Sequence, residues 1–181
     1  MKIDGKTIHS EEEILTALQE EFDLDDEMLL KGLFTAGAVG YLLMKNASVS
    51  GAEAGCQAEI GSAAAMAAAA ATEMMGGTPE QCLDAASITL SDMLGLVCDP
   101  IAGLVEMPCQ TRNAAGASNA LTSAEMVLAG IKAAVPFTEM SAAMYRVGKE
   151  LPYELRETAL GGCAATPTGC SLKCKIFGGC D

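Results

Sequence analysis

The feature that most constrains the fold is a long run of small residues in the first half of the sequence. Ten of the 22 residues at 54–75 are alanine, and Gly76 and Gly77 follow directly. Alanine has the highest helix propensity, whereas glycine commonly ends a helix, so we expect one long helix here. Such small side chains let helix backbones approach closely. With no Trp and only 4% aromatic residues, the chain has to build its core from closely packed helices.

The flanking segments also show helical patterns, and together they predict an all-α fold of about six to seven helices. Ser10, followed by three glutamates, is typical of a helix start, and that helix is expected to continue to about residue 21. Thr78 and Pro79 are typical of the N-cap and first position of another helix. Further helices are expected over about residues 27–45, 113–133, 138–149 and 152–160.

Composition divides the chain into three parts: an acidic N-terminal segment (1–25), a helical domain (26–162) and a Gly- and Cys-rich tail (163–181). An irregular loop over residues 95–112 interrupts the helical domain. Half of the residues are hydrophobic, so we expect an apolar surface that seeks a partner. Residues 63–71 are the expected docking surface, although the same run also suits a buried core helix.

The charge balance excludes some classes of partner. The chain carries 24 acidic and 11 basic residues, a formal net charge of −13. Nucleic acids and anionic membranes bind basic surfaces, so neither is expected as a partner. No pattern of a signal peptide is found, and the most apolar stretch is too polar at its start for a membrane span. We therefore expect a cytoplasmic protein.

Eight cysteines need an explanation, because a chain of this kind does not resemble a secreted disulfide scaffold. Cys82 lies in a helical pattern among apolar residues and is expected to be a packing residue. Cys56 lies where the alanine-rich helix begins, and a helix N-terminus favours a thiolate. Cys98 and Cys109 bracket the loop CDPIAGLVEMPC, where prolines stiffen the turns. Three such thiols can hold three irons of a four-iron cluster and leave the fourth open.

Three runs carry a family resemblance: NASVSGAEAGCQAEIG, LGLVCDPIAGLVEMPCQTRNA and LRETALGGCAATPTG. They closely resemble the α chain of bacterial iron–sulfur L-serine dehydratases, over about residues 26–177. The resemblance implies a [4Fe-4S] cluster on Cys56, Cys98 and Cys109 and the conversion of L-serine to pyruvate and ammonia without pyridoxal phosphate. It also implies an oligomer with a regulatory β chain and a partner chain that supplies a catalytic region expected ahead of the matching part.

Several residues near these motifs are candidates for the elimination chemistry. Glu53 and Glu59 are candidate general bases, although Glu59 equally suits stabilisation of a helix start. Arg112 can bind a substrate carboxylate or form a structural ion pair, and Asn113 is a candidate positioning residue. Cys180 is a possible tail ligand to the cluster, whereas the roles of Cys163, Cys170 and Cys174 stay open. Other candidate positioning residues are Asn46, Ser48, Ser50, Gln57 and Asp99.

Three alternatives remain at this point. A related iron–sulfur lyase acting on cysteine would use the same open iron. A non-catalytic helical cluster-binding subunit, which needs a separate chain, would keep the cysteines without the reaction. An electron-transfer module is less favoured, because the cysteine spacing does not fit the familiar ferredoxin runs.

Overall fold

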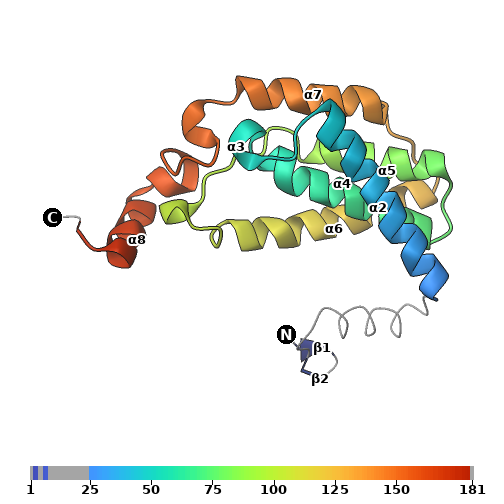
Figure 1. The fold of residues 1–181 in the computed structure, drawn as a ribbon, viewed down its shortest axis with the longest axis horizontal. Coiled ribbons are helices and arrows are strands. Elements are labelled where there is room, and N and C mark those ends of the chain that lie inside the picture. The colour runs from blue at the N-terminus through green and yellow to red at the C-terminus, as the bar shows by residue number, and fades with distance from the viewer. Residues whose placement is uncertain (1, 4–5, 8–24, 180–181) are drawn as a thin grey trace.

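The computed structural model describes residues 2–3, 6–7 and 25–179 of the 181-residue chain. Within them, helices form nearly all of the regular structure (Figure 1), so the all-α prediction is confirmed. Near the N-terminus, β1 (Lys2–Ile3) pairs antiparallel with β2 (Lys6–Thr7), with Lys2 opposite Thr7. The helix predicted from Ser10 and the tail ligand predicted at Cys180 lie outside the described residues.

Seven α-helices lie within the described part of the chain. They are α2 (Asp26–Asn46), α3 (Gly51–Ala54), α4 (Cys56–Met74), α5 (Pro79–Asp92), α6 (Cys109–Leu128), α7 (Phe137–Glu150) and α8 (Pro167–Phe177). Three short 3-10 turns connect them: η1 (Ile101–Gly103), η2 (Tyr153–Leu155) and η3 (Gly162–Ala165).

Several helix boundaries follow from local chemistry. The predicted cap of α5 is confirmed, because Thr78 Oγ1 accepts a hydrogen bond from Gln81 N (3.3 Å) and Gln81 Oε1 accepts one from Thr78 N (2.9 Å). The same chemistry forms a helix that the sequence did not indicate. Pro167 is the first residue of α8, and Thr166 Oγ1 accepts from Gly169 N at 3.0 Å. Part of the Cys-rich tail is therefore helical.

Other boundaries differ from the prediction. The long helix expected over residues 54–75 is α4 and begins two residues later, at Cys56, because Gly55, with a φ of +76°, ends the short helix α3 just before it. The irregular loop ends at Pro108 rather than at residue 112, because α6 begins at Cys109. The helix expected over residues 152–160 is only the short turn η2, since the chain beyond it adopts positive φ at Glu157 and Ala159.

Helix α4 forms the centre of the fold, in contact with α2, α5, α6 and α7 (Figure 1). Its alanines at 65, 68 and 69 are fully buried, which confirms that this face of residues 63–71 belongs to a core helix. Ala63 and Ala67 are exposed, and a docking role for that face stays a prediction. Because alanine has no bulk beyond Cβ, four helices can pack closely around α4. Leu43, Leu90 and Met144 supply the largest apolar side chains of this core.

Helix α2 packs on α4 through two glycines. A Cβ atom at Gly32 would lie 2.7 Å from Met74 Cγ, and one at Gly40 would lie 2.8 Å from Met66 Sδ. Each glycine therefore forms a notch that accepts a methionine side chain from α4. The flexible thioether of methionine suits such a gap.

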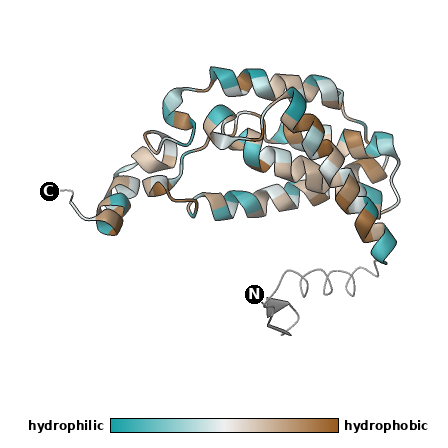
Figure 2. Ribbon diagram, in the orientation of Figure 1, coloured by the Kyte–Doolittle hydropathy of each residue, from teal (hydrophilic) through white to brown (hydrophobic). Residues whose placement is uncertain are grey.

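Helix α2 contains many hydrophobic residues (Figure 2), and several large apolar side chains on it are exposed. Leu33, Phe34 and Met44 are 55%, 77% and 60% exposed. By length and composition, α2 is the one helix in the described part of the chain that is apolar enough to cross a membrane. The apolar surface expected from composition is therefore found on α2.

Two leucines of α2 test this division between buried and exposed faces. Leu43→Ala should lower the free energy of unfolding by about 2–5 kcal/mol, because it leaves a cavity in the core, where Leu43 is fully buried. Leu33→Ala, on the exposed face, is the matched control and should lower it by less than about 1 kcal/mol. Urea unfolding of both variants measures the difference. Equal losses would contradict the packing described for α2.

Candidate metal centre

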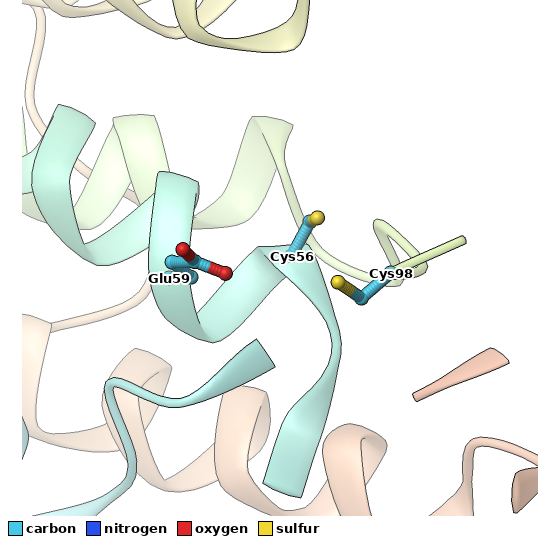
Figure 3. A group of neighbouring side chains, drawn as sticks. All are labelled: Cys56, Glu59 and Cys98. Carbon is cyan, nitrogen blue, oxygen red and sulfur yellow. The ribbon is translucent and has the colours of Figure 1, made fainter. Parts of the chain in front are cut away.

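Three buried cysteines come from three different parts of the fold. Cys56 is the first residue of α4, Cys109 is the first residue of α6, and Cys98 lies in the loop after α5. All three are buried. The Sγ atoms of Cys56 and Cys98 and a carboxylate oxygen of Glu59 all lie within 4.8 Å of one another (Figure 3). Thiolate and carboxylate groups arranged in this way are potential metal ligands.

The N-terminus of α4 is fixed against the loop that carries Cys98. Gln57 N donates to Leu96 O at 2.9 Å, and the Gln57 side chain accepts from Gly95 N at 2.8 Å. The same side chain donates to Met144 O on α7 at 3.0 Å. Gln57 is 1% exposed, so these hydrogen bonds form in a dry interior where an unpaired amide would be costly. Cys56, its neighbour, is held in place with it.

The backbone of Cys98 is held on both sides by the segment that follows α7. Cys98 N donates to Leu155 O at 2.9 Å, and Glu157 N donates to Cys98 O at 2.7 Å. These two bonds form an isolated parallel bridge between Cys98 and Arg156. No local pattern predicts this contact, because the pairing joins segments far apart in the chain.

Asp99 ties the cysteine loop to two further elements. Its buried carboxylate forms an ion pair with Arg112 of α6 and accepts a hydrogen bond from Cys163 N at 2.6 Å. Burial by itself raises the pKa of Asp99, but the hydrogen bonds from Cys163 and Arg112 bring the pKa below its usual value. Arg112 Nη1 also donates to Val97 O at 3.0 Å. The Asp99 carboxylate is therefore ionised, and both of its oxygens accept hydrogen bonds.

The three thiols differ in acidity. A hydrogen bond from Cys98 lowers the pKa of Cys56 against the opposing effect of burial, and the nearby Arg112 adds to the lowering. The same hydrogen bond, together with burial, raises the pKa of Cys98. Burial and the negative charge of Cys56 raise the pKa of Cys109. A bound cation would favour the thiolate form of each cysteine, because its positive charge would offset burial and the neighbouring negative charges.

Cys82 shows the contrasting behaviour of a packing residue. It belongs to the core cluster around Leu43 and Leu90. Burial and the neighbouring Glu73 raise the pKa of its thiol to about 11. The prediction that Cys82 is a packing residue is confirmed.

Gly51 packs closely against the site and leaves no room for a side chain. A Cβ atom at Gly51 would lie 2.6 Å from Glu59 Oε2 and 3.1 Å from Cys98 Sγ. Any larger residue would therefore displace Glu59 or Cys98. The buried thiols form a soft donor set, which makes the residues present compatible with an iron–sulfur cluster.

The other predicted site residues lie in different surroundings. Glu53 binds Lys149 (2.6 Å) and accepts from Ser48 (2.7 Å), away from the three cysteines. Arg112 has the structural ion pair that the sequence left open. Asn113 and Glu59 line a groove of about 380 Å³ between α4 and α6, whose other lining residues are alanine, glycine and isoleucine. Their catalytic roles stay predictions.

Sequence reasoning missed Glu157 as a residue of this site. Its Oε2 atom would lie 3.6 Å from a Cβ at Gly51, the same point that approaches Glu59 and Cys98. Its φ of +65° is unusual for glutamate and strains the backbone by about 1–3 kcal/mol. The run LRETALGG was noticed as a motif, but a local sequence does not reveal a left-handed backbone at a non-glycine residue.

The chain is similar to known proteins over most of its length. The sequence model of the family described as "Serine dehydratase alpha chain" matches residues 13–164. A probable L-serine dehydratase, alpha chain, from Bacillus subtilis is 58% identical over 91% of this chain and 55% of its own length. The corresponding Latilactobacillus sakei protein is 52% identical over 91% of this chain and 79% of its own length. The L-serine dehydratase alpha chain of Peptoniphilus asaccharolyticus is 51% identical over 88% of this chain and 55% of its own length.

Two glycines with positive φ separate the effect of backbone strain from that of close contact. A Cβ at Gly162 (φ +58°) would overlap the Asp99 carboxylate, whereas one at Gly130 (φ +93°) would meet nothing within 4 Å. Gly130→Ala should destabilise by about 1–2 kcal/mol through strain alone. Gly162→Ala should destabilise clearly more, because it also displaces Asp99. Thermal unfolding measures both, and equal effects would argue against the tight contact.

The lowered pKa of Asp99 predicts how the stability of the fold depends on pH. Its folded-state pKa is lowered, so its stabilising effect is complete above the unfolded pKa of ~3.9 and is lost as pH falls through the folded value. Asp99→Asn should lower the free energy of unfolding by about 3 kcal/mol at pH 7, because it leaves Arg112 uncompensated. The variant should also lose less stability than the wild type below about pH 4.

Urea unfolding at pH 7, 5, 4 and 3 tests this expectation. Asp92→Asn, at an exposed carboxylate, is the control and should change stability by less than about 0.5 kcal/mol. A parallel decline for Asp99→Asn and the wild type would contradict the role assigned to Asp99.

Proposed function

The chain belongs to the serine dehydratase alpha chain family, and from that premise we propose that it carries the iron–sulfur centre of an L-serine ammonia-lyase. The observation that supports this most directly is the position of the three cysteines. Cys56 and Cys109 are buried at the starts of two helices, and the Cys98 sulfur lies within 4.8 Å of the Cys56 sulfur on a loop fixed by Asp99. That close group includes Glu59 but not Cys109, whose role as a ligand is part of the proposal. Buried thiols on a rigid frame suit a cofactor better than they suit packing alone.

In this proposal Cys56, Cys98 and Cys109 hold a [4Fe-4S] cluster. When bound, the cluster supplies an open iron that acts as a Lewis acid toward the carboxylate and hydroxyl of the substrate. The reaction removes the α proton and the β hydroxyl of L-serine, and water then converts the aminoacrylate product to pyruvate and ammonia. This chain's own residues have to position the substrate and accept the proton.

Glu59 is the best-placed candidate for the general base. Its carboxylate lies beside Cys56 and Cys98 and is exposed enough to meet a substrate. Glu53 is less suitable, because Lys149 and Ser48 already occupy its two oxygens. Arg112 acts in this proposal as a positioning residue, since its Nη1 group is bound to Asp99 and Val97.

The complete enzyme extends beyond this chain in the proposal. The chain spans 55% of the Bacillus subtilis relative, 55% of the Peptoniphilus relative and 79% of the Latilactobacillus relative. We propose that sequence corresponding to the rest of the longer relatives, together with a β chain, completes a cytoplasmic oligomer. The exposed apolar face of α2 is compatible with such an assembly.

Anaerobic reconstitution with iron and sulfide tests the cluster. The wild-type chain should bind about four irons per chain and show the visible absorption of an iron–sulfur cluster. Cys56→Ser, Cys98→Ser and Cys109→Ser should each lose most of this iron and absorption. Cys82→Ala, at a buried thiol outside the site, and Cys170→Ser, at an exposed thiol, are controls that should keep it.

Pyruvate release tests the reaction and separates the alternatives. L-Serine, L-cysteine and L-threonine should be compared with the chain alone and with the chain plus a family β chain. Pyruvate formed fastest from serine supports the proposed activity, and faster release from cysteine would indicate the related lyase. A cluster without any turnover, even with the β chain, would favour a cluster-binding subunit. No cluster under any condition would overturn the ligand assignment.

A further inference from the structure

The outer side of α2 carries a regular stripe of apolar positions. Leu30, Phe34, Tyr41 and Met44 are 54%, 77%, 55% and 60% exposed. Gly37 is also exposed, and a Cβ atom there would meet nothing within 4 Å. In chain order these five positions are four, three, four and three residues apart, the apolar repeat with which one helix packs against another in a coiled coil. We call the five positions the outer stripe of α2.

The inner side of α2 is held by the rest of the fold. Val39 and Leu43 are buried in the core, and Gly32 and Gly40 accept methionine side chains from α4. Helix α2 could therefore be surrounded by lipid only if it left the bundle (Figure 1). The formal net charge of −13 also opposes binding to an anionic membrane surface. The outer stripe therefore suits a protein partner that presents an apolar helix.

The two ends of α2 carry opposite charges. Asp25 and Glu27 are exposed at its start, whereas Lys45 is exposed in its last turn. The ammonium group of Lys45 lies over the ring of Tyr41, 5.7 Å from its centroid, and Lys45 takes part in none of the ion pairs formed by the described residues. An antiparallel helix of the same sequence would bring an acidic start beside this basic end. A parallel one would place like charges side by side, which is unfavourable.

We propose that α2 forms the interface of a homodimer, in which the outer stripes of two copies of this chain pack antiparallel. A second copy suits this surface because the stripe is complementary to itself. When the two-fold axis passes between residues 35 and 36, Phe34 lies against the partner's Gly37, and Leu30 lies against the partner's Tyr41. The Phe34 ring fills the gap that glycine leaves, and two-fold symmetry makes every contact occur twice.

The same register brings opposite charges together at both ends of the interface. Because each residue advances a helix by about 1.5 Å, Lys45 lies level with the partner's Glu27 to within about 1.5 Å. Glu27 already binds Lys31 of its own helix at 2.7 Å, but a carboxylate has two oxygens and can accept from both lysines. No residue of the metal centre takes part, so the proposed dimer does not depend on the proposed function.

Sedimentation equilibrium of the full chain measures the dimer. Oxygen is excluded and a thiol reductant is present, so disulfides between copies do not contribute. The wild type should change from monomer to dimer as its concentration rises, with a dissociation constant on the order of 1–100 µM, because one pair of helices is a small interface. Phe34→Asp should weaken the dimer more than about 100-fold, because it buries two charges. Phe177→Asp, on α8 at 60% exposure, is the matched control and should leave the dimer unchanged.

An exchange of charges tests the antiparallel register. Lys45→Glu should weaken the dimer roughly 10-fold, because two attractions become two repulsions. Glu27→Lys combined with Lys45→Glu should restore most of the affinity, since antiparallel copies again pair opposite charges. Circular dichroism checks that each variant keeps its helix content. If Phe34→Asp loses helix, the charge exchange alone decides.

Three results would overturn the inference. The first is a wild-type chain that stays monomeric over the whole concentration range. The second is a dimer that a folded Phe34→Asp variant still forms, or one that Lys45→Glu weakens and the exchange of charges does not restore. The third is a wild-type chain that uses Phe34 to bind neutral phospholipid vesicles or a family β chain instead of a second copy. Iron content and pyruvate release are measured separately, so failure of the dimer leaves the proposed function standing.

Discussion

The buried carboxylate of Asp99 is the interaction on which the geometry of the site depends. It joins the cysteine loop to α6 through Arg112 and to the segment before α8 through Cys163 N. The loop has further hydrogen bonds to its surroundings. Arg112 donates to Val97 O, and the backbone of Cys98 is bonded to Leu155 and Glu157. A charge in the interior is tolerated only when it is fully hydrogen-bonded. The requirement to satisfy Asp99 therefore holds together the cysteine loop, the first turn of α6 and the segment before α8.

The second constraint is the alanine-rich core. Because α4 is lined by alanine, its neighbours approach closely, and its first residue, Cys56, is held by the hydrogen bonds of Gln57 to Gly95 and Met144. The cysteines consequently come from rigid elements, which suits a site that must hold its ligands in a defined geometry. The acidic residues Glu59 and Glu157 then differ from Asp99 in one respect. Both approach Cys98, but none of the ion pairs formed by the described residues includes either of them.

Much of the fold could be predicted from the sequence, and the reasons are local. Alanine propensity, the Thr78–Pro79 cap and helical periodicity are encoded within a few residues, so they predict where helices form. The three cysteines could be singled out as candidate ligands because Cys56 and Cys109 stand at helix starts and Cys98 lies two residues before Pro100. Other features depend on contacts between distant segments. The break at Gly55, the Asp99–Arg112 pair and the position of Glu157 arise when α4, the 95–108 loop and the 152–163 segment meet, and no local pattern encodes that meeting.

The packing of α2 on α4 makes this contact sensitive to oxidation. Gly32 and Gly40 accept the side chains of Met74 and Met66 without space to spare. Oxidation of either thioether to a sulfoxide would add a polar oxygen at a contact fitted to an apolar group. Such damage would loosen α2 from the core without touching a cysteine. Resistance to oxidants in this chain is therefore also a property of its helix packing, and repair by a methionine sulfoxide reductase would be needed to restore it.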